Sequence, residues 1–234
     1  MSTTSANTVS GLDTVTTPTV PMPALVDERL ARQELCRFLA GCYYEPGVEF
    51  AEERLFESIA AAAQRISPEL AEHAQRLAAA FAAADLQDLL VDYTRLFLGA
   101  PQALAKPYAS VWLTDDPELM QESVVELQKL YAQGGFAMDE DFRDLPDHVA
   151  VELEFLYLLN FQQNQAQAGG DEQALQALAV LRTAFLVGHL GRWLGPFILA
   201  VHDHAQSEFY RELAEFTELF VRLEGQCQYG VTRH

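Results

Sequence analysis

Titratable side chains gather around the start of a predicted helix in the middle of the chain. Residues 144–148 read Asp-Leu-Pro-Asp-His, and Glu152 follows four positions after His148. A proline and acidic residues are favourable at such a position, because the first N–H groups of a helix lack partners and its dipole is positive at that end. A capped helix start is therefore one interpretation. Capping does not require histidine, whose charge can change near neutral pH, so a binding site is the other interpretation.

The same residues could also hold a metal ion. His148 and Glu152 are four residues apart, so they would share one face of a helix and form a possible ligand pair. With Asp147 they would suit a metal-dependent hydrolase, which is our alternative from a different functional class. No histidine has a glutamate three positions before it, and HExxH is absent. His202 and His204 are two apart and point to different sides of a helix, so the pattern favours no metal site.

Standard motifs of nucleotide and acyl chemistry are absent. The sequence contains no GxxxxGKS or GxxxxGKT phosphate loop, no GxGxxG turn and no GxSxG nucleophile elbow. Its three cysteines, Cys36, Cys42 and Cys227, include no CxxC pair, so they do not fit the usual zinc or disulfide spacings. We expect reduced, mostly buried thiols and no catalytic residue.

Aromatic residues are concentrated in a second segment. Residues 93–99 read Tyr-Thr-Arg-Leu-Phe-Leu-Gly, and residues 106–113 read Lys-Pro-Tyr-Ala-Ser-Val-Trp-Leu. Aromatic side chains on a loop that contains proline are typical of a recognition surface. We therefore interpret residues 100–113 as a surface loop with exposed aromatic groups. The alternative is that Tyr108 and Trp112 only hold this loop against the core.

The charge of the chain selects among classes of partner. With 34 acidic residues against 15 Lys and Arg, the formal net charge is −19. This argues against nucleic acid, because binding to phosphates needs clustered basic residues. It suits a basic peptide, since opposite charges speed and orient the encounter. No apolar run approaches the roughly 20 residues that span a bilayer, so we expect a soluble chain without membrane insertion.

Helices must position both segments, because helix-forming residues dominate and apolar residues recur three and four apart. We expect an all-α, single-domain bundle of about nine or ten helices over residues 26–224. A disordered tail is expected at 1–25 and a flexible end at 225–234. The N-terminal segment lacks a signal-peptide pattern, because the first basic residue is Arg29.

Two features of the helical pattern locate the motifs. Residues 149–161 are apolar almost all round, which predicts a helix central to the domain, and a polar linker is expected from there to Asp171. The Gly195-Pro196 pair predicts a break in a later helix. The Asp144–His148 segment would then precede the central helix directly.

The two segments resemble signatures of the TorD/DmsD/NarJ family of molybdoenzyme maturation chaperones. Tyr-x-Arg-Leu-Phe-x-Gly from Tyr93, followed by Pro-Tyr-x-Ser-Val-Trp-Leu from Pro107, is similar to the first signature. Leu-Pro-Asp-His at 145–148, running into a Glu-Leu helix, is similar to the central one. Segments 185–197 and 209–214 resemble the helices near the C-terminus of the family.

The resemblance covers residues 30–223 in the family's order, with one departure at 99–101, where Gly-Ala-Pro replaces the Gly-Pro of many relatives. It implies a TorD-like helical fold that is not catalytic, with no cofactor or metal. It implies a cytoplasmic protein that binds the twin-arginine signal peptide and apo-form of a molybdopterin oxidoreductase until its cofactor is inserted, before export. A NarJ-like assembly chaperone of a membrane-associated molybdoenzyme is the alternative. Either a monomer or a helix-swapped dimer is compatible.

The resemblance also implies where the peptide binds. Its guanidinium groups would pair with Asp144 and Asp147, and His148 would orient Asp147. Its apolar part would cover Leu96 and Phe97 together with nearby aromatic rings. The predicted peptide-binding residues are Asp144, Pro146, Asp147, His148, Glu152, Tyr93, Leu96, Phe97, Gly99, Pro107, Tyr108, Ser110 and Trp112.

Overall fold

The computed structural model describes residues 22–48, 50, 54–99, 103–138 and 144–227. Within these ranges every regular element is a helix, and the β-type pairing is limited to an isolated bridge between Tyr108 and His148. The all-α fold class expected from the sequence is therefore confirmed. The expected N-terminal tail lies outside the described residues up to residue 21, and the expected flexible end lies outside them from residue 228.

Helices follow one another along most of the described chain. In chain order they are α1 (Met22–Cys42), α3 (Leu55–Ile66), α4 (Pro68–Ala83), α5 (Leu86–Tyr93), α6 (Ala109–Leu113), α7 (Pro117–Gln133), α8 (Val149–Gly169), α9 (Glu172–Phe185), α10 (Gly191–His204) and α11 (Glu208–Gln226). A π-helical turn at Thr94–Leu98 extends α5. Another, at Leu186–Leu190, joins α9 to α10.

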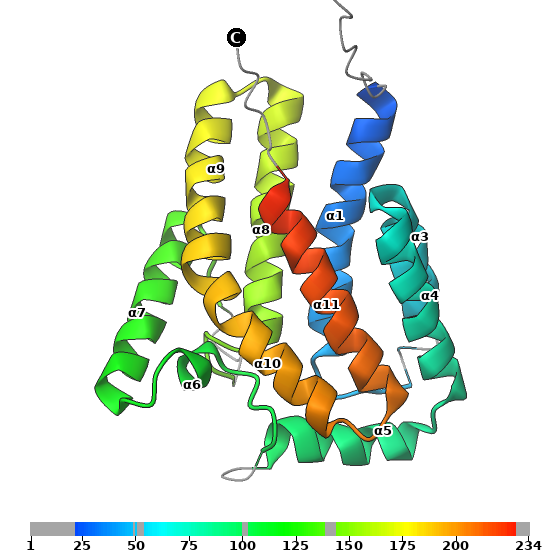
Figure 1. Ribbon diagram of the computed structural model, residues 1–234. Helices are drawn as coiled ribbons and strands as arrows, with labels where there is room; N and C mark the ends of the chain where they lie inside the picture. Colours follow the sequence, from blue (N-terminus) through cyan, green and yellow to red (C-terminus); the bar gives the residue numbers. More distant parts are fainter. Residues whose placement is uncertain (1–21, 49, 51–53, 100–102, 139–143, 228–234) are drawn as a thin grey trace, which may run out of the picture.

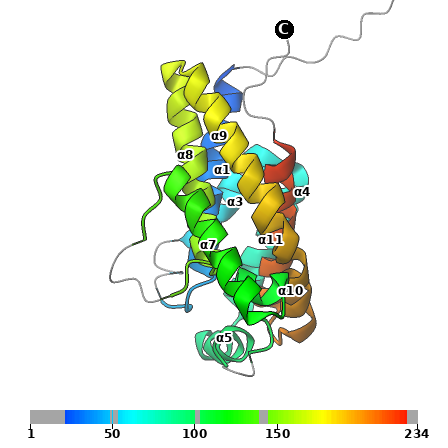
Figure 2. The ribbon, with the colours of Figure 1, turned by 90° about the vertical axis from the view of Figure 1, so that its left-hand side faces the viewer.

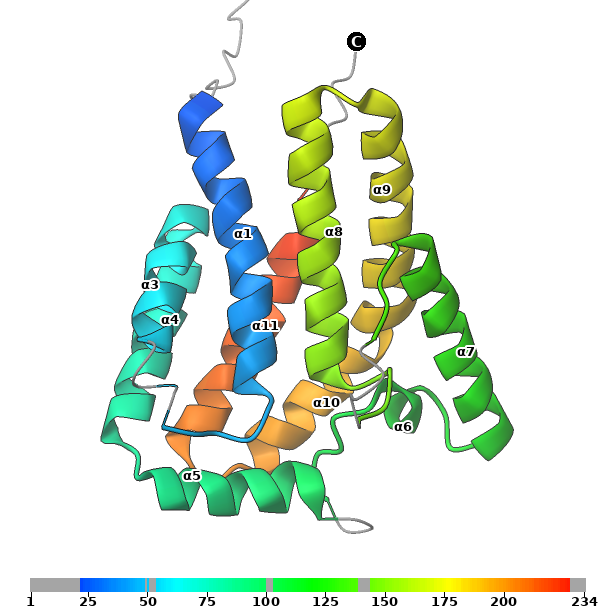
Figure 3. The ribbon, with the colours of Figure 1, turned by 180° about the vertical axis from the view of Figure 1, so that it is seen from behind.

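The bundle is organised around α1 and α8, which pack side by side (Figure 3). α3 and α4 lie on one side of α1, while α9 packs on α8 and α11 packs on α4 and α10 (Figure 1). α7 packs on the outer side of α9 (Figure 2). α5 lies across one end of the bundle, and α8 begins near that end (Figure 3). Both sequence motifs therefore meet at the end of the molecule that α5 closes.

Side-chain caps fix where most of these helices begin. Ser67, Asp85, Asp116, Asp171 and Ser207 each accept a hydrogen bond from a backbone N–H in the first turn of the helix that follows. Such caps satisfy N–H groups that have no partner inside the helix, typically contributing about 1 kcal/mol each. Polar residues that neighbour these helices in the chain therefore determine where they begin.

Two helices run further than their sequence pattern predicted. α8 does not end near residue 161 but continues through the expected linker, which is rich in Gln and Ala, good helix formers. It ends where Gly170 adopts a left-handed conformation with φ 67°. α10 runs through Pro196 without the expected break. Burying Trp193 and Phe197, at about 1.5–3 kcal/mol each, offsets the roughly 3 kcal/mol that proline costs inside a helix.

The helical stretch Glu172–His204, which includes α9 and α10, is long and apolar enough to cross a membrane by length and composition alone. We expected no such stretch because we considered only uninterrupted apolar runs. By mean hydropathy this expectation was wrong, because an 18-residue window within Glu172–His204 has a mean hydropathy of 1.4. Half of that window is buried in the bundle. Because core helices pass the same test, the length of this stretch does not assign a membrane span.

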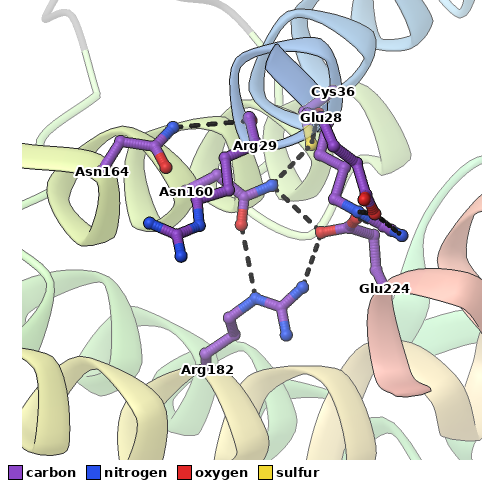
Figure 4. Close-up of polar contacts among 8 residues, drawn as sticks. Glu28, Arg29, Cys36, Asn160, Asn164, Arg182 and Glu224 are labelled. Carbon is purple, nitrogen blue, oxygen red and sulfur yellow. Dashed lines mark hydrogen bonds and ion pairs between the residues drawn. The ribbon is translucent and has the colours of Figure 1, made fainter. Parts of the chain in front are cut away.

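A buried charged network joins four helices. Glu224 of α11 is fully buried, and its carboxylate accepts hydrogen bonds from Arg32 of α1 at 2.8 Å and Arg182 of α9 at 2.6 Å. Asn160 of α8 donates to the same carboxylate at 3.0 Å. Arg182 and Asn160 both point toward Glu224 (Figure 4). Mutual attraction and hydrogen bonding offset the cost of burying these charges, provided that every partner is present.

The three cysteines all lie in the described part of the chain and form no disulfide. Cys36 and Cys42 are buried, and Cys227 is partly buried. Burial raises the pKa of Cys42, because a thiolate loses its hydration inside the core. The expectation of mostly buried thiols is confirmed.

Candidate functional site

His148 is the N-cap of α8. Its Nδ1 accepts a hydrogen bond from the N–H of Ala150 at 3.1 Å, so the ring is neutral and carries its proton on Nε2. The ring is buried, stacked on Tyr44 with centroids 5.9 Å apart, and edge-on to Tyr108 at 5.4 Å. Burial lowers the pKa of His148, although the nearby Asp144 carboxylate acts in the opposite direction.

Asp147 attaches the aromatic loop to the start of α8. Its Oδ2 accepts a hydrogen bond from the N–H of Ser110 at 2.9 Å, and its backbone oxygen accepts one from Ala109 at the same distance. On the other side, the N–H of Val149 donates to the carbonyl oxygen of Pro107 at 2.8 Å. Asp147 is 1% exposed, and its Oδ1 has no hydrogen-bond partner within the described structure. The structure therefore places this carboxylate inside the fold, as a clamp on the loop.

The loop predicted at 100–113 is partly helical. α6 occupies its last five residues, and the Asp147 carboxylate accepts a hydrogen bond from the first turn of this short helix. Trp112 is half-buried, and its Nε1 donates to the carbonyl oxygen of Lys106 at 2.7 Å. Its ring lies 6.3 Å from that of Phe197. Trp112 therefore holds the loop against the core, as one of our two interpretations proposed.

Asp144 and Tyr108 form the exposed edge of the site. The Tyr108 hydroxyl donates to Asp144 Oδ1 at 2.9 Å, and the Asp144 side chain is 34% exposed. The Nε2 of His148 lies 3.8 Å from Asp144 Oδ2. The pKa of Tyr93 is raised to about 12, mainly by burial of its hydroxyl and to a smaller extent by the negative charge of Asp144. Tyr93 is buried, at 6% exposed, and keeps its hydroxyl proton at neutral pH.

The structure adds two residues that were not among the predicted peptide-binding residues. The Tyr44 hydroxyl, just beyond the end of α1, donates to Glu154 of α8 at 3.0 Å. Both side chains are half-buried, and the Tyr44 ring stacks on His148. We call the set Tyr44, Tyr108, Asp144 and Glu154 the tyrosine–carboxylate patch. Carboxylates flanked by aromatic rings provide the hydrogen-bond acceptors and ring faces that bind guanidinium groups.

Glu152 lies away from this patch. It is fully buried, and its carboxylate accepts hydrogen bonds from His189 Nε2 at 2.8 Å and Trp193 Nε1 at 3.2 Å. Burial raises the pKa of Glu152, while the Glu152 carboxylate raises the pKa of His189 despite the burial of the ring. The pairing of His148 with Glu152 expected from their spacing is therefore replaced by a pair of Glu152 with His189.

Leu96 and Phe97 also lie in the core. They are 0% and 4% exposed, and the Phe97 ring contacts those of Tyr43 and Tyr210. The π-helical turn directs both side chains inward, which the motif alone could not show. A peptide that covers the apolar residues of the first signature would therefore find these two side chains inaccessible.

The remaining predicted residues have supporting positions. Pro107 is buried, and Pro146 is half-buried with its carbonyl oxygen accepting a hydrogen bond from Tyr131 at 2.8 Å. Gly99 ends the π-helical turn and lines a shallow groove of about 440 Å³ with Arg95. The structure thus brings the loop residues together with the 144–148 segment, while Gly99 lines a groove of its own.

Comparisons with known proteins agree with the motifs. The family described as "Nitrate reductase delta subunit" matches residues 63–199. The "Chaperone protein TorD" of Shewanella loihica is 29% identical over 182 residues, which cover 76% of this chain and 80% of the relative. The proteins of that name from Vibrio parahaemolyticus and Photobacterium profundum are 28% and 29% identical over 143 residues, 61% of this chain. The chain spans 65% of the length of each of these last two relatives.

Proposed function

Because the chain belongs to the nitrate reductase delta subunit family, we propose that it is a cytoplasmic chaperone that binds the twin-arginine signal peptide and apo-form of a molybdopterin oxidoreductase. It would hold this precursor until the cofactor is inserted, before export. The resemblance to TorD-type chaperones noted in the sequence is confirmed by the family match and by relatives that carry that name. The chain is therefore a molybdoenzyme maturation chaperone and not an enzyme.

The observation that carries this proposal is the tyrosine–carboxylate patch. Asp144 is 34% exposed, already accepts one hydrogen bond from Tyr108, and lies 3.8 Å from the His148 ring on which Tyr44 stacks. An arginine of the peptide would form charge-assisted hydrogen bonds with the Asp144 carboxylate and pack its planar guanidinium against a ring. Glu154 offers a carboxylate for the second arginine of the pair.

The motif residues then have two roles, contact with the peptide and support of the residues that contact it. Asp144 and Tyr108 would contact the peptide, whereas Tyr93 is buried and belongs to the core. Asp147 and His148 would act as positioning residues, because their hydrogen bonds fix the loop and the start of α8 from inside. The buried members of the motif would support the loop from the core. This assignment keeps Asp144 as a direct contact of the peptide and gives Asp147 a positioning role instead.

The apolar part of a signal peptide needs an apolar surface near this point. Leu145, next to Asp144 in the chain, is 54% exposed and so offers its side chain to a partner. Trp112 is half-buried four residues after Tyr108. We assign these two residues, rather than Leu96 and Phe97, to the apolar segment that follows the arginine pair. Peptide ordering on binding limits the affinity, so a Kd of about 1 μM or somewhat lower is expected.

The test is calorimetric titration with a panel of twin-arginine signal peptides from molybdoenzymes, each beside its Lys-Lys counterpart. We expect one peptide to bind tightly and its Lys-Lys counterpart weakly, because lysine lacks the planar fork of donors. Asp144→Asn should weaken binding, whereas Asp203→Asn, which removes the same charge from an exposed position on α10, should not. Equal affinity for Arg-Arg and Lys-Lys peptides would contradict arginine recognition.

One observation favours a second role within the family. The matching family is named after a subunit of nitrate reductase. Our alternative is therefore a NarJ-like chaperone that assembles a membrane-associated molybdoenzyme. Such a protein would recognise the N-terminal segment of its client without the arginine pair. Binding to peptides that lack twin arginines, with none to those that carry them, would favour this role.

A further inference from the structure

A second cluster of titratable side chains lies where α4, α10 and α11 meet. His73 Nδ1 of α4 is 3.9 Å from a carboxylate oxygen of Glu212 and 3.8 Å from one of Glu215, both on α11. His202 Nε2 of α10 is 3.5 Å from the other oxygen of Glu215. Three of these side chains line an open groove of about 680 Å³, which gives the cluster access to solvent.

We propose that this cluster is a binding site for a divalent transition metal of the zinc type. The ligand atoms of His73, Glu212 and Glu215 all lie within 4.8 Å of one another. Zinc bonds to nitrogen and oxygen are about 2.0–2.2 Å long, which places neighbouring ligands of a tetrahedral site roughly 3.3–3.6 Å apart. The distances from His73 Nδ1 to the two carboxylates are 3.9 and 3.8 Å, so these ligands need to approach one another only slightly to bind an ion. A water molecule would complete the shell, and His202 would hold the other oxygen of Glu215.

Arg76 is the cation that this cluster holds in the structure. Its guanidinium donates to both oxygens of Glu212, at 2.9 and 3.1 Å, and lies 2.6 Å from His73 Nδ1. Because arginine is always protonated, the His73 Nδ1 must be the acceptor in this contact and carries no proton. Its lone pair therefore already points into the cluster, as metal binding requires.

A metal ion would displace Arg76 without disturbing the core. The Arg76 side chain is 45% exposed, whereas its partner Glu212 is only 10% exposed, so a metal ion would take over the compensation of a nearly buried carboxylate. Arg76 is one turn after His73 on α4, so its flexible stem can turn toward solvent while the backbone stays in place. The two carboxylates carry two negative charges, and the whole chain carries a net charge of −19, so the site attracts divalent cations.

The ligand types select the class of metal. Calcium and magnesium prefer oxygen ligands alone, whereas imidazole suits zinc and its neighbours in the first transition row. One imidazole and two carboxylates from two helices, with one water, would close a tetrahedral shell. A bound ion would then join α4 to α11, and it would hold residues from distant parts of the chain together.

The experiment is titration of the untagged chain, stripped of metal with EDTA, with ZnCl₂ by calorimetry. We expect wild-type protein to bind zinc at this site, and His73→Ala and Glu215→Gln to lower the affinity about tenfold or more. Arg76→Ala should raise the affinity, because it removes the competing cation. His204→Ala removes an exposed histidine outside the cluster and should leave the affinity unchanged. Circular dichroism of each variant verifies that it is folded.

A second readout reports the geometry. Cobalt bound in place of zinc should give the intense visible bands of a tetrahedral site, and His73→Ala should lose them. Absence of zinc binding, or binding that His73→Ala and Glu215→Gln leave unchanged, would overturn the site. Arg76→Ala without gain in affinity would also overturn it. None of these measurements depends on the signal peptide, so the metal site and the chaperone function are tested separately.

Discussion

The Tyr108 hydroxyl donates a hydrogen bond to Asp144 at 2.9 Å and so connects the two motifs, which lie 36 residues apart in the chain. This bond is at the exposed edge of the site, whereas the contacts of Asp147 and His148 lie behind it. The two motifs thus form one surface, supported by a buried layer. Substitutions in the exposed edge should therefore affect peptide binding alone, and substitutions in the buried layer should affect stability as well.

Tyr108→Phe should weaken binding of the signal peptide without unfolding the chain. The change removes one hydroxyl, which leaves the Asp144 carboxylate unoriented at a cost of about 1 kcal/mol, roughly fivefold in Kd. Tyr157→Phe, a half-buried tyrosine further along α8, is the matched control and should bind as wild type. Calorimetric titration measures both variants. Equal Kd values for Tyr108→Phe and wild type would remove Tyr108 from the binding surface.

Asp147→Ala should reduce stability as well as binding. The backbone N–H of Ser110 would lose its acceptor in a buried position, which costs about 1–3 kcal/mol. Asp147→Asn keeps an acceptor oxygen for the same N–H and should be milder. Urea unfolding gives the free energies, and hydrogen exchange at the Ser110 amide reports the clamp directly. Faster exchange at Ser110 in Asp147→Ala, but not in Asp147→Asn, is the expected result, and equal exchange in both would argue against the clamp.

The sequence predicted the helices well and the surface of the site poorly, for physical reasons. Apolar spacing and capping residues such as Ser67 and Asp116 act locally, so helix starts follow from neighbouring residues. Burial depends on how helices pack, so Asp147 looked like a binding group and lies in the interior. Tyr44 and Glu154 belong to the patch only because α1 packs on α8, and no spacing within one segment reveals this.

The residues of the proposed metal site illustrate the same limit. Spacing along one helix relates His202 only to its neighbour His204, which points to another side of that helix. In the structure His202 and His73 both approach Glu215 of α11, which is far from His73 in the chain. A site assembled from separate helices leaves no local motif, so its recognition requires coordinates.

His148 should make the protein less stable in acid. Burial keeps the ring neutral and lowers its pKa in the folded state below the ordinary value of 6.5. As pH falls below about 6.5 the unfolded chain takes up a proton that the folded chain does not, so stability is present above that pH and is lost below it. The loss is at most about 1.4 kcal/mol per pH unit.

The comparison for this effect is His148→Asn, because asparagine is a good N-cap and does not titrate. Urea unfolding at pH 7.5 and pH 5.5 gives the free energy of unfolding of each protein. We expect the stability of wild type relative to His148→Asn to fall between these two values of pH. A constant difference would show that His148 does not titrate differently in the folded and unfolded states.

Glu224→Gln should be the most destabilising of these substitutions. Glu224 is fully buried and is the acceptor that Arg32 and Arg182 share, so its neutralisation removes the charge that faces both guanidinium groups and leaves Arg32 with Glu28 alone. Breaking a buried pair in this way costs about 3–5 kcal/mol. Glu57→Gln, which breaks an exposed pair with Arg54 on the surface, removes the same charge and should cost less than about 1 kcal/mol. Thermal and urea unfolding measure both variants. Equal losses would mean that the network of α1, α8, α9 and α11 holds the bundle no more firmly than a surface ion pair.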